Sequence, residues 1–460
     1  MKRAATRARA GKEARACAAA MWLLVLCVPC LLAAATVQAP ATNARRPAGR
    51  SDRRVYAEPP LPALPRAGGT FIDRVFGTEV MRVTDERDGK SCGTYYSYWP
   101  TFNADSTRLV ARRAGVGDAV YEFDPVNFKL GKSYAFPPTP GGGSFITEGA
   151  VWSATDPDTL YGGTFSGPRL LAFDASTRSY KLVRDFSREQ GFAPTDYLWQ
   201  MSMSEDEDVF AFTHRNSAYK TLGYLVYKRS TDKVLLNVRS TAEDEVQIDK
   251  TGRFLQIPLS KADADGKIYY VHDLRTGTKT GLVPGAPDYS PGHGDVGAGV
   301  SIAWDNDENR LLYRDLGRPR AFKSILDLKT DWTQGLHVSL RARSDEWALV
   351  SFEAVATVGA GLFHRELVLV KTDGSQQVRR LLHHRSIYRD YWDAPHANIS
   401  YDGRFVAFAS NWGGTNRTDL FVARLDPPLP TDSRTPTPPA PPSQATPTRG
   451  NTRSRRVSPQ

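Results

Sequence analysis

The chain has 460 residues, of which 24% are charged and 40% are hydrophobic, as in an ordinary globular protein. Its 37 glycines, 31 prolines and 10% aromatic residues favour turn-rich β structure. The net charge of +10 is carried largely by residues near the two chain ends, and no basic stripe with interleaved aromatics lies between them. The sequence therefore predicts no nucleic-acid binding.

The first 39 residues have the composition of an export signal. Basic residues precede an apolar run from 18 to 39, and the small residues Ala33, Ala34 and Ala35 provide a cleavage site. We interpret 1–39 as a signal peptide or, alternatively, as an uncleaved signal anchor, which is the only membrane contact we expect. Both interpretations predict an exported protein that is periplasmic, secreted or held at the cell surface.

Two further segments lack the pattern of a folded domain. Residues 40–69 are rich in Pro and Arg and have no hydrophobic period, so we interpret them as a linker. Residues 427–460 form a Pro/Thr/Ser/Arg tail that cannot build a core, and we expect this tail to be disordered. The folded part is then predicted to span residues 70–426.

Residues 70–426 repeat one pattern at a spacing of roughly 45 to 60 residues, which is typical of propeller blades. Each copy is a short strand, an Asp-containing turn and an alternating strand, and most are followed by a hairpin with Asp, Gly, Ser or Thr in its bend. The copies begin at Tyr98, Gly149, Leu198, Asp244, His293, Leu336 and Pro395. We therefore predict an all-β protein, a seven-bladed β-propeller that is most simply a monomer.

The two ends of the repeat region are complementary. The stretch "GTEVMRVTD", residues 77–85, alternates like an outer strand, and the last copy ends after its third strand at 419–426. A propeller ring must be closed, so we predict that the N-terminal strand completes the seventh blade.

The phrase "SYDGRFVAFAS" from Ser400 to Ser410 resembles the blade motif of secreted TolB-type and WD-like propellers of bacteria. This resemblance covers the whole repeat region and implies the fold rather than an activity. It is compatible with a non-catalytic scaffold that presents a binding surface in the periplasm or on the cell surface. No Gly-x-Ser-x-Gly nucleophile elbow is present in the sequence.

Equivalent positions of the innermost strands converge at one face of a propeller. Three neighbouring copies carry His293, His337 and His396 at that position, and Glu245 and Gln200 occupy it in the two preceding copies. Together these side chains could ligate a divalent metal such as Mn, Ca or Zn. The alternative interpretation is that each histidine is structural and hydrogen-bonds a turn.

Loops predicted at the same face carry groups suited to an anionic sugar. Aromatic rings stack on sugars, guanidinium groups pair with carboxylates, and a His or Tyr can remove a proton. The candidate catalytic residues are His214, Arg215 and Tyr219. The candidate substrate-binding residues are Arg385, Tyr388, Tyr391, Trp392 and Trp412, with Arg112 and Arg113 nearby.

The predicted funnel resembles in architecture the oligogalacturonate lyases, seven-bladed propellers that hold a metal through histidines and a glutamine. The resemblance implies β-elimination on a uronate polysaccharide. In that family two histidines and the glutamine come from one short stretch, whereas "DAPHANIS" here offers His396 alone. The sequence thus leaves two hypotheses: a metal-assisted polysaccharide lyase, or a propeller that binds an anionic carbohydrate or a protein ligand without cleaving it.

Overall fold

The protein is an all-β propeller of seven sheets, as the sequence predicts. The computed structural model describes residues 49–328, 334–354 and 361–431. Every named strand pairs antiparallel with its neighbour in the sheet, and the helical elements among the described residues are three short 3-10 turns. None of the helices in these ranges is long and apolar enough to cross a membrane. The signal interpretation of residues 1–39 falls outside the described residues.

Six sheets have four strands each, in which consecutive strands lie side by side. Blade one contains β3 (Cys92–Gly93), β4 (Arg108–Arg113), β5 (Ala119–Asp124) and β6 (Lys129–Ala135). Blade two contains β7 (Phe145–Trp152), β8 (Thr159–Thr164), β9 (Gly167–Asp174) and β10 (Ser179–Asp185). Blade three contains β11 (Tyr197–Met203), β12 (Val209–Arg215), β13 (Thr221–Lys228) and β14 (Lys233–Arg239).

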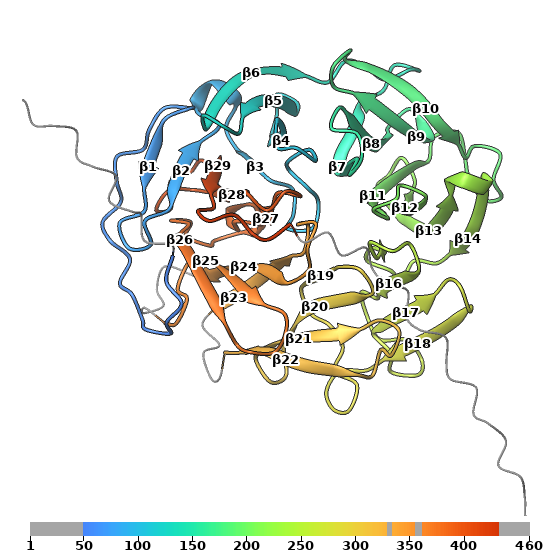
Figure 1. Ribbon diagram of the computed structural model, residues 1–460. Helices are drawn as coiled ribbons and strands as arrows, with labels where there is room; N and C mark the ends of the chain where they lie inside the picture. The colour runs from blue at the N-terminus through green and yellow to red at the C-terminus, as the bar shows by residue number, and fades with distance from the viewer. Residues whose placement is uncertain (1–48, 329–333, 355–360, 432–460) are drawn as a thin grey trace, which may run out of the picture. The chain divides into compact units, whose positions relative to one another are not determined.

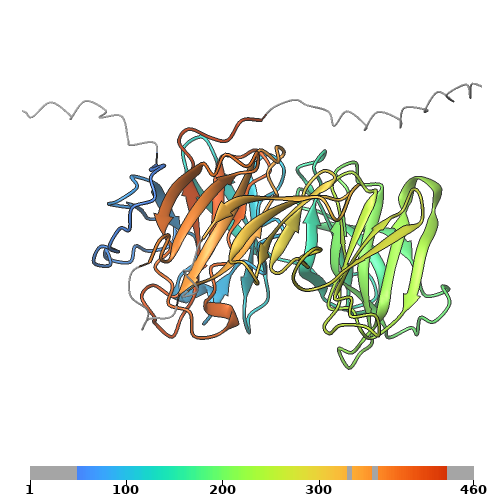
Figure 2. The same cartoon turned by 90° about the horizontal axis from the view of Figure 1, so that it is seen from below.

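The next three blades follow the same order. Blade four contains β15 (Gln247–Ile248), β16 (Phe254–Pro258), β17 (Tyr269–Asp273) and β18 (Thr278–Leu282). Blade five contains β19 (Gly294–Val296), β20 (Val300–Asp305), β21 (Arg310–Asp315) and β22 (Phe322–Asp327). Blade six contains β23 (Gln334–Ser339), β24 (Trp347–Ala354), β25 (Glu366–Lys371) and β26 (Val378–His383). Figure 2 shows the yellow and orange strands of blades five and six side by side.

The seventh sheet joins the two ends of the folded chain, which confirms the predicted closure. Its order is β1 (Thr70–Ile72), β2 (Glu79–Arg82), β29 (Asp419–Arg424), β28 (Phe405–Ser410) and β27 (Asn398–Ile399). Strand β2 pairs with β29, so that Val80 faces Ala423 across the sheet. In Figure 1 the blue strands β1 and β2 accordingly lie beside the red strand β29. One further strand, β1, makes this sheet five-stranded.

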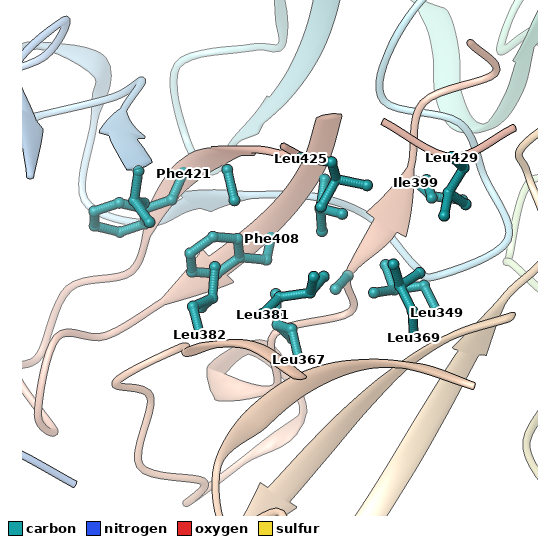
Figure 3. Close-up of a cluster of buried hydrophobic side chains, with 14 of the residues drawn as sticks. Leu349, Leu367, Leu369, Leu381, Leu382, Ile399, Phe408, Phe421, Leu425 and Leu429 are labelled. Carbon is teal, nitrogen blue, oxygen red and sulfur yellow. The ribbon is translucent and has the colours of Figure 1, made fainter. Parts of the chain in front are cut away.

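Hydrophobic side chains fill the space between each pair of neighbouring sheets. One cluster joins blade six to the closing sheet and includes Leu367, Leu382, Phe408 and Phe421 (Figure 3). Corresponding clusters lie at the other six junctions around the ring. A blade alone cannot bury both of its faces, so these junctions supply the burial that holds the sheets together.

Asp-containing turns connect the first and second strands of the blades. In blade four the Asp249 Oδ1 accepts the backbone N–H groups of Arg253 and Phe254 at 2.9 and 2.8 Å. In the closing sheet the Ser400 Oγ accepts the N–H of Phe405 at 3.0 Å, and Gly403 adopts φ +67° in the bend. The side-chain oxygens replace the backbone partners that the turn lacks, which explains the recurring Asp and Ser.

The described part of the predicted linker, residues 49–69, contains no strand but is fastened to the propeller. Buried side chains donate hydrogen bonds to its backbone carbonyls: Arg380 to Arg54 at 2.6 Å, and Arg385 to Pro59 at 2.7 Å. The backbone of Arg50 also forms a bridge with that of Arg380. Hydrogen bonding therefore extends the ordered structure N-terminally beyond β1, although no regular strand forms there.

Candidate functional site

The repeat positions singled out in the sequence meet at one end of the inner strands. Glu148, which occupies the same repeat position in blade two, lies in β7, and Gln200 lies in β11. His293 directly precedes β19, and Glu245 lies two residues before β15. These four side chains, with Trp99, line one cavity of about 460 Å³. The register of the repeat thus brings together residues that are far apart along the chain.

The three histidines are direct neighbours. The ring centroids of His293 and His337 are 4.4 Å apart, and those of His337 and His396 are 4.6 Å apart. His337 and His396 are buried, whereas His293 is exposed toward the cavity. His396 has φ +37°, a left-handed conformation that is uncommon for a residue with a side chain. We refer to these three residues as the histidine trio.

Hydrogen bonds place Nδ1 of two of the histidines against an oxygen atom. His293 Nδ1 lies 3.2 Å from the carbonyl oxygen of Leu336, so it carries the hydrogen of that bond. His337 Nδ1 is likewise paired with the carboxylate of Glu353. In the neutral ring of His293, Nε2 is then the acceptor. The buried Nε2 of His396 has no hydrogen-bond partner among the described residues.

Two members of the trio, His293 and His396, are uncharged at neutral pH. Although His293 is exposed to the cavity, the surrounding protein partly desolvates its ring, and this desolvation, followed by the neighbouring His337, lowers its pKa below the usual 6.5. Burial, together with His337 and His293, lowers the pKa of His396 much further. The exposed Nε2 of His293 is therefore an unprotonated base that faces the cavity.

Two tyrosines pack over the trio. The Tyr96 ring is 4.8 Å from both His337 and His396, and the Tyr391 ring is 4.6 Å from His396. Burial raises the pKa of both phenols above the usual 10. Both hydroxyl groups consequently keep their protons at neutral pH and can act as proton donors.

A second cavity of about 660 Å³ adjoins the first, because Glu148 lines both. Its wall includes Arg112 from β4 and Trp392 from the 3-10 turn η3 (Tyr391–Asp393). The guanidinium carbon of Arg112 lies 4.0 Å from the Trp392 ring centre, a cation–π contact. Arg112 is buried, forms no ion pair with a described carboxylate, and its Nε has no described partner. It is therefore available to an anionic ligand.

The three residues predicted as catalytic lie in blade three, where Arg215 and Tyr219 both contact the Trp199 ring and His214 belongs to a separate buried pair. His214 is buried, stacked on Phe192 at 3.8 Å, and paired with Asp196 at 2.8 Å. Arg215 instead lies over the Trp199 ring, and Tyr219 is 60% exposed. The contacts of His214 are those of a buried structural pair.

The five predicted substrate-binding residues divide into two groups. Tyr391 and Trp392 line the cavities. Tyr388 lies on the loop just before them in the sequence. Arg385 is buried beside Glu58 and Asp73. Trp412 is buried against Phe421, with its indole N–H donating to the Pro62 carbonyl. Arg385 and Trp412 thus hold residues 49–69 in place rather than line either cavity.

The prediction from the sequence omitted Tyr96 and Trp199 as site residues. Tyr96 belongs to the run "TYYSYW" (94–99), which precedes the second strand of blade one, and it lies over the trio. Trp199 stands next to Gln200 in β11 and lines the second cavity. A density of aromatic residues beside the repeat position is the signal that would have identified both.

Comparison with known proteins gives a fold. No family model and no curated protein matches this chain. The fold resembles that of oligogalacturonate lyase. A structure of oligogalacturonate lyase in complex with manganese aligns with a TM-score of 0.58 at 14% identity, covering 79% of this chain and 97% of that one. The oligogalacturonate lyase of Vibrio parahaemolyticus aligns with a TM-score of 0.56 at 12% identity, covering 77% and 96%.

Because the first of these structures contains manganese, we compare the geometry of the trio with that of imidazoles that bind a metal. A ligating imidazole holds a metal in its own ring plane at about 2.1 Å. The rings of His293 and His337 are stacked, with only 23° between their planes, so their planes do not meet at such a distance. Among the described residues no group of three or more His, Cys, Asp or Glu is placed to hold a metal ion. As they lie, these side chains do not fit a metal.

Glu245 supplies a prediction about pH. Its burial raises its pKa to about 7, against hydrogen bonds from Tyr98 and Gln247 that favour the charged form. The folded state therefore holds this proton more tightly than the unfolded chain, and the stability so gained is lost as pH rises from about 4.5 to 7.

We expect Glu245→Gln to be more stable than the wild type above pH 7. Its free energy of unfolding minus that of the wild type should be larger there than at pH 5 by on the order of 2 kcal/mol. Urea denaturation at pH 5 and pH 8 measures this. Glu122→Gln, at an exposed position of β5, is the matched control. An equal effect of Glu245→Gln at both pH values would contradict the buried, protonated carboxyl.

Proposed function

We propose that the protein is an exported lyase that cleaves a uronate-containing polysaccharide by β-elimination in the cavity beside His293. The observation that supports this proposal is the unprotonated Nε2 of His293. The Nδ1 of the same ring is hydrogen-bonded to the Leu336 carbonyl, and the residue lines a cavity that tyrosines also line. The names of the structures with a similar fold suggest the class of substrate.

The uronate carboxylate requires a cation, because the C5–H bond next to it becomes acidic only when the carboxylate charge is neutralised. Arg112 is suited to this task. Its guanidinium face is stacked on Trp392, which leaves the N–H groups at its edge for a carboxylate. Among the described residues, the Arg112 side chain donates one hydrogen bond, to the Ser91 hydroxyl at 3.1 Å.

In the proposed reaction His293 Nε2 takes the C5 proton. The electron pair of the C5–H bond forms a double bond between C4 and C5, and the C4–O4 bond breaks. The leaving O4 takes a proton from the phenol of Tyr391. Water then returns a proton to Tyr391, and the hydroxide so formed takes the proton from His293, which restores both groups. Each group starts in the required state, since His293 is neutral and Tyr391 is protonated at neutral pH.

The test is the appearance of the unsaturated product, followed by its ultraviolet absorbance, on a panel of uronate polymers. We expect His293→Gln to lower kcat by about 10²- to 10⁴-fold, the usual contribution of a general base. His272→Gln, on the third strand of blade four, is the matched control and should keep the wild-type rate. The rate should rise with pH only below about 6.5, where His293 loses its proton, and then stay level.

Three outcomes would overturn the proposal. A wild-type protein that binds a uronate polymer but releases no unsaturated product would be a binding protein instead. A His293→Gln variant with wild-type kcat would remove the assigned base. An activity that disappears on chelation and returns with Mn²⁺ would mean that the trio rearranges around a metal, which would replace this acid–base scheme.

A further inference from the structure

Two buried polar groups line the cavity beside His293 without a hydrogen-bond partner. In β16 the Tyr269 hydroxyl donates to Gln256 Oε1, which leaves the N–H groups on Nε2 of the same amide without an acceptor. In β20 the hydroxyl of Ser301 has no partner among the described residues. Gln256 is 3% exposed and Ser301 is 2% exposed. Within the described ranges these are the two lining residues of this cavity whose buried side-chain atoms are unpaired.

The alternation of the strands turns both side chains toward the junction between blades four and five. Leu255 and Ile257, on either side of Gln256, belong to the apolar cluster shared with blade three. Ile302, next to Ser301, belongs to the cluster shared with blade six. Successive side chains of a strand point to opposite faces, so Gln256 faces blade five and Ser301 faces blade four. They therefore border one recess of the cavity, which we call the junction pocket.

Two apolar residues continue the faces of Gln256 and Ser301. Pro258 and Ala303 stand two residues further along the same strands, so each lies on the same face as its polar neighbour. Both line the cavity as well. The junction pocket thus combines hydrogen-bonding groups with a small apolar surface, and a ligand group that fills it needs both a polar and an apolar part.

The charges around the cavity disfavour an ionic group in this pocket. The lining residues include Glu148, Asp244, Glu245 and Asp295, and none of them is Arg or Lys. A carboxylate or a sulfate would therefore meet like charges without a cation. An ammonium group would meet the N–H donors of Gln256 instead of an acceptor. A neutral carbonyl oxygen, in contrast, accepts from these donors and pairs them.

We propose that the junction pocket binds an acetyl group carried by the sugar in the cavity. The carbonyl oxygen accepts from Gln256 Nε2 and Ser301 Oγ. The methyl group packs against Pro258 and Ala303. This inference rests on the proposed function, to which it adds that the polysaccharide is acetylated, while the uronate carboxylate pairs with Arg112 in the adjoining cavity. Binding then satisfies two polar groups that are costly to bury unpaired.

Calorimetry at constant pH and salt compares two pairs of ligands, whose members differ at the acetyl group. One pair is O-acetylated trigalacturonate and the same oligomer after de-esterification. The other is an N-acetylated heparosan tetrasaccharide and its de-N-acetylated form. We expect the wild type to bind the acetylated member of at least one pair about 10- to 50-fold more tightly, the combined value of a neutral hydrogen bond and a buried methyl group. The pair that shows this preference identifies the linkage of the acetyl group.

Ser301→Val fills the pocket and should abolish the preference, while the unacetylated member binds as it does to the wild type. Gln256→Leu removes the N–H donors and should reduce the preference. The matched control is Ser324→Val, at another buried hydroxyl without a described partner, in β22 of the same blade and outside the cavity. It should keep the full preference. Ser301→Ala leaves the pocket open and should keep part of it, which shows that the loss in Ser301→Val is not unfolding.

Binding and cleavage separate the two proposals. Acetyl-dependent binding without any unsaturated product would overturn the lyase and keep the junction pocket. Equal binding of both members in each pair, tighter binding of the unacetylated members, or an undiminished preference in Ser301→Val would each overturn the junction pocket. No binding of any of these ligands by the wild type would overturn it too, even where another uronate polymer is cleaved.

Discussion

Replacing Arg380 by methionine is expected to lower the free energy of unfolding by about 3–5 kcal/mol, because it leaves Glu366 as an unpaired carboxylate in the interior. Both side chains are fully buried, and Arg380 Nε donates to Glu366 Oε2 at 2.7 Å. The same guanidinium holds the carbonyl of Arg54 and lies over the rings of Tyr56 and Phe76. Urea denaturation followed by fluorescence measures the loss.

The loss should depend on pH in a defined direction. Burial raises the pKa of Glu366, and removal of the arginine removes the main opposing charge. The folded state of Arg380→Met then favours the protonated carboxyl, so its stability should increase as pH falls toward 5. Changing Glu366 to Leu in the Arg380→Met protein should restore much of the stability.

Arg318→Met is the matched control. Arg318 pairs with Asp315, but its side chain is 79% exposed, and such surface pairs contribute about 0–1 kcal/mol. If Arg380→Met and Arg318→Met lowered the free energy of unfolding by the same small amount, the buried Arg380–Glu366 pair would not stabilise the fold as the structure indicates.

The second expected result concerns ring closure: Val80→Asp should prevent the closing sheet from forming and cost at least about 4 kcal/mol. Val80 is 0% exposed in β2, opposite Ala423 of β29. Its side chain belongs to the cluster that joins blade six to the closing sheet. An aspartate there would be a buried charge without a partner, and the backbone edge of β29 would become free to pair with other chains.

The measurements are the melting temperature and the size distribution by gel filtration, where larger species are expected for Val80→Asp. Ile72→Asp introduces the same charge in the neighbouring strand β1, where the side chain is 43% exposed. That control should stay within about 0.5 kcal/mol of the wild type. Equal behaviour of the two variants would mean that β2 is dispensable for closure.

The sequence was sufficient for the fold because the blade pattern is local. The Asp249 and Ser400 turns and the alternating strands that follow are readable from neighbouring residues, and the closing strand followed from a missing partner at the other end. Residues 49–69 show the limit of this reasoning. These residues are attached to the propeller through backbone carbonyls that accept hydrogen bonds from Arg380 and Arg385. Hydrophobic periodicity cannot reveal contacts of this kind.

The site was only half visible for a related reason. The register of the repeat predicts which residues share the end of the inner strands, so the proximity of His293, His337 and His396 could be anticipated. Side-chain orientation could not, because the stacking of His293 on His337 depends on Leu336 and Glu353. Similarly, nothing in the local sequence distinguishes His214, which has its own buried partner in Asp196, from a histidine at a cavity.

The closing sheet also has a consequence for the order of folding. Strands β2 and β29 come from opposite ends of the folded chain, so their pairing brings together residues 79–82 and 419–424. As the chain is synthesised, blades one to six can form their own hairpins in turn. Strand β2, in contrast, can pair with β29 only after the C-terminal end of the folded region has been made. Long-range pairing of this kind is slow and leaves strand edges exposed in the meantime. We therefore expect the unpaired strand edges to favour aggregation until β29 pairs with β2, and this closure to be the slow step of folding.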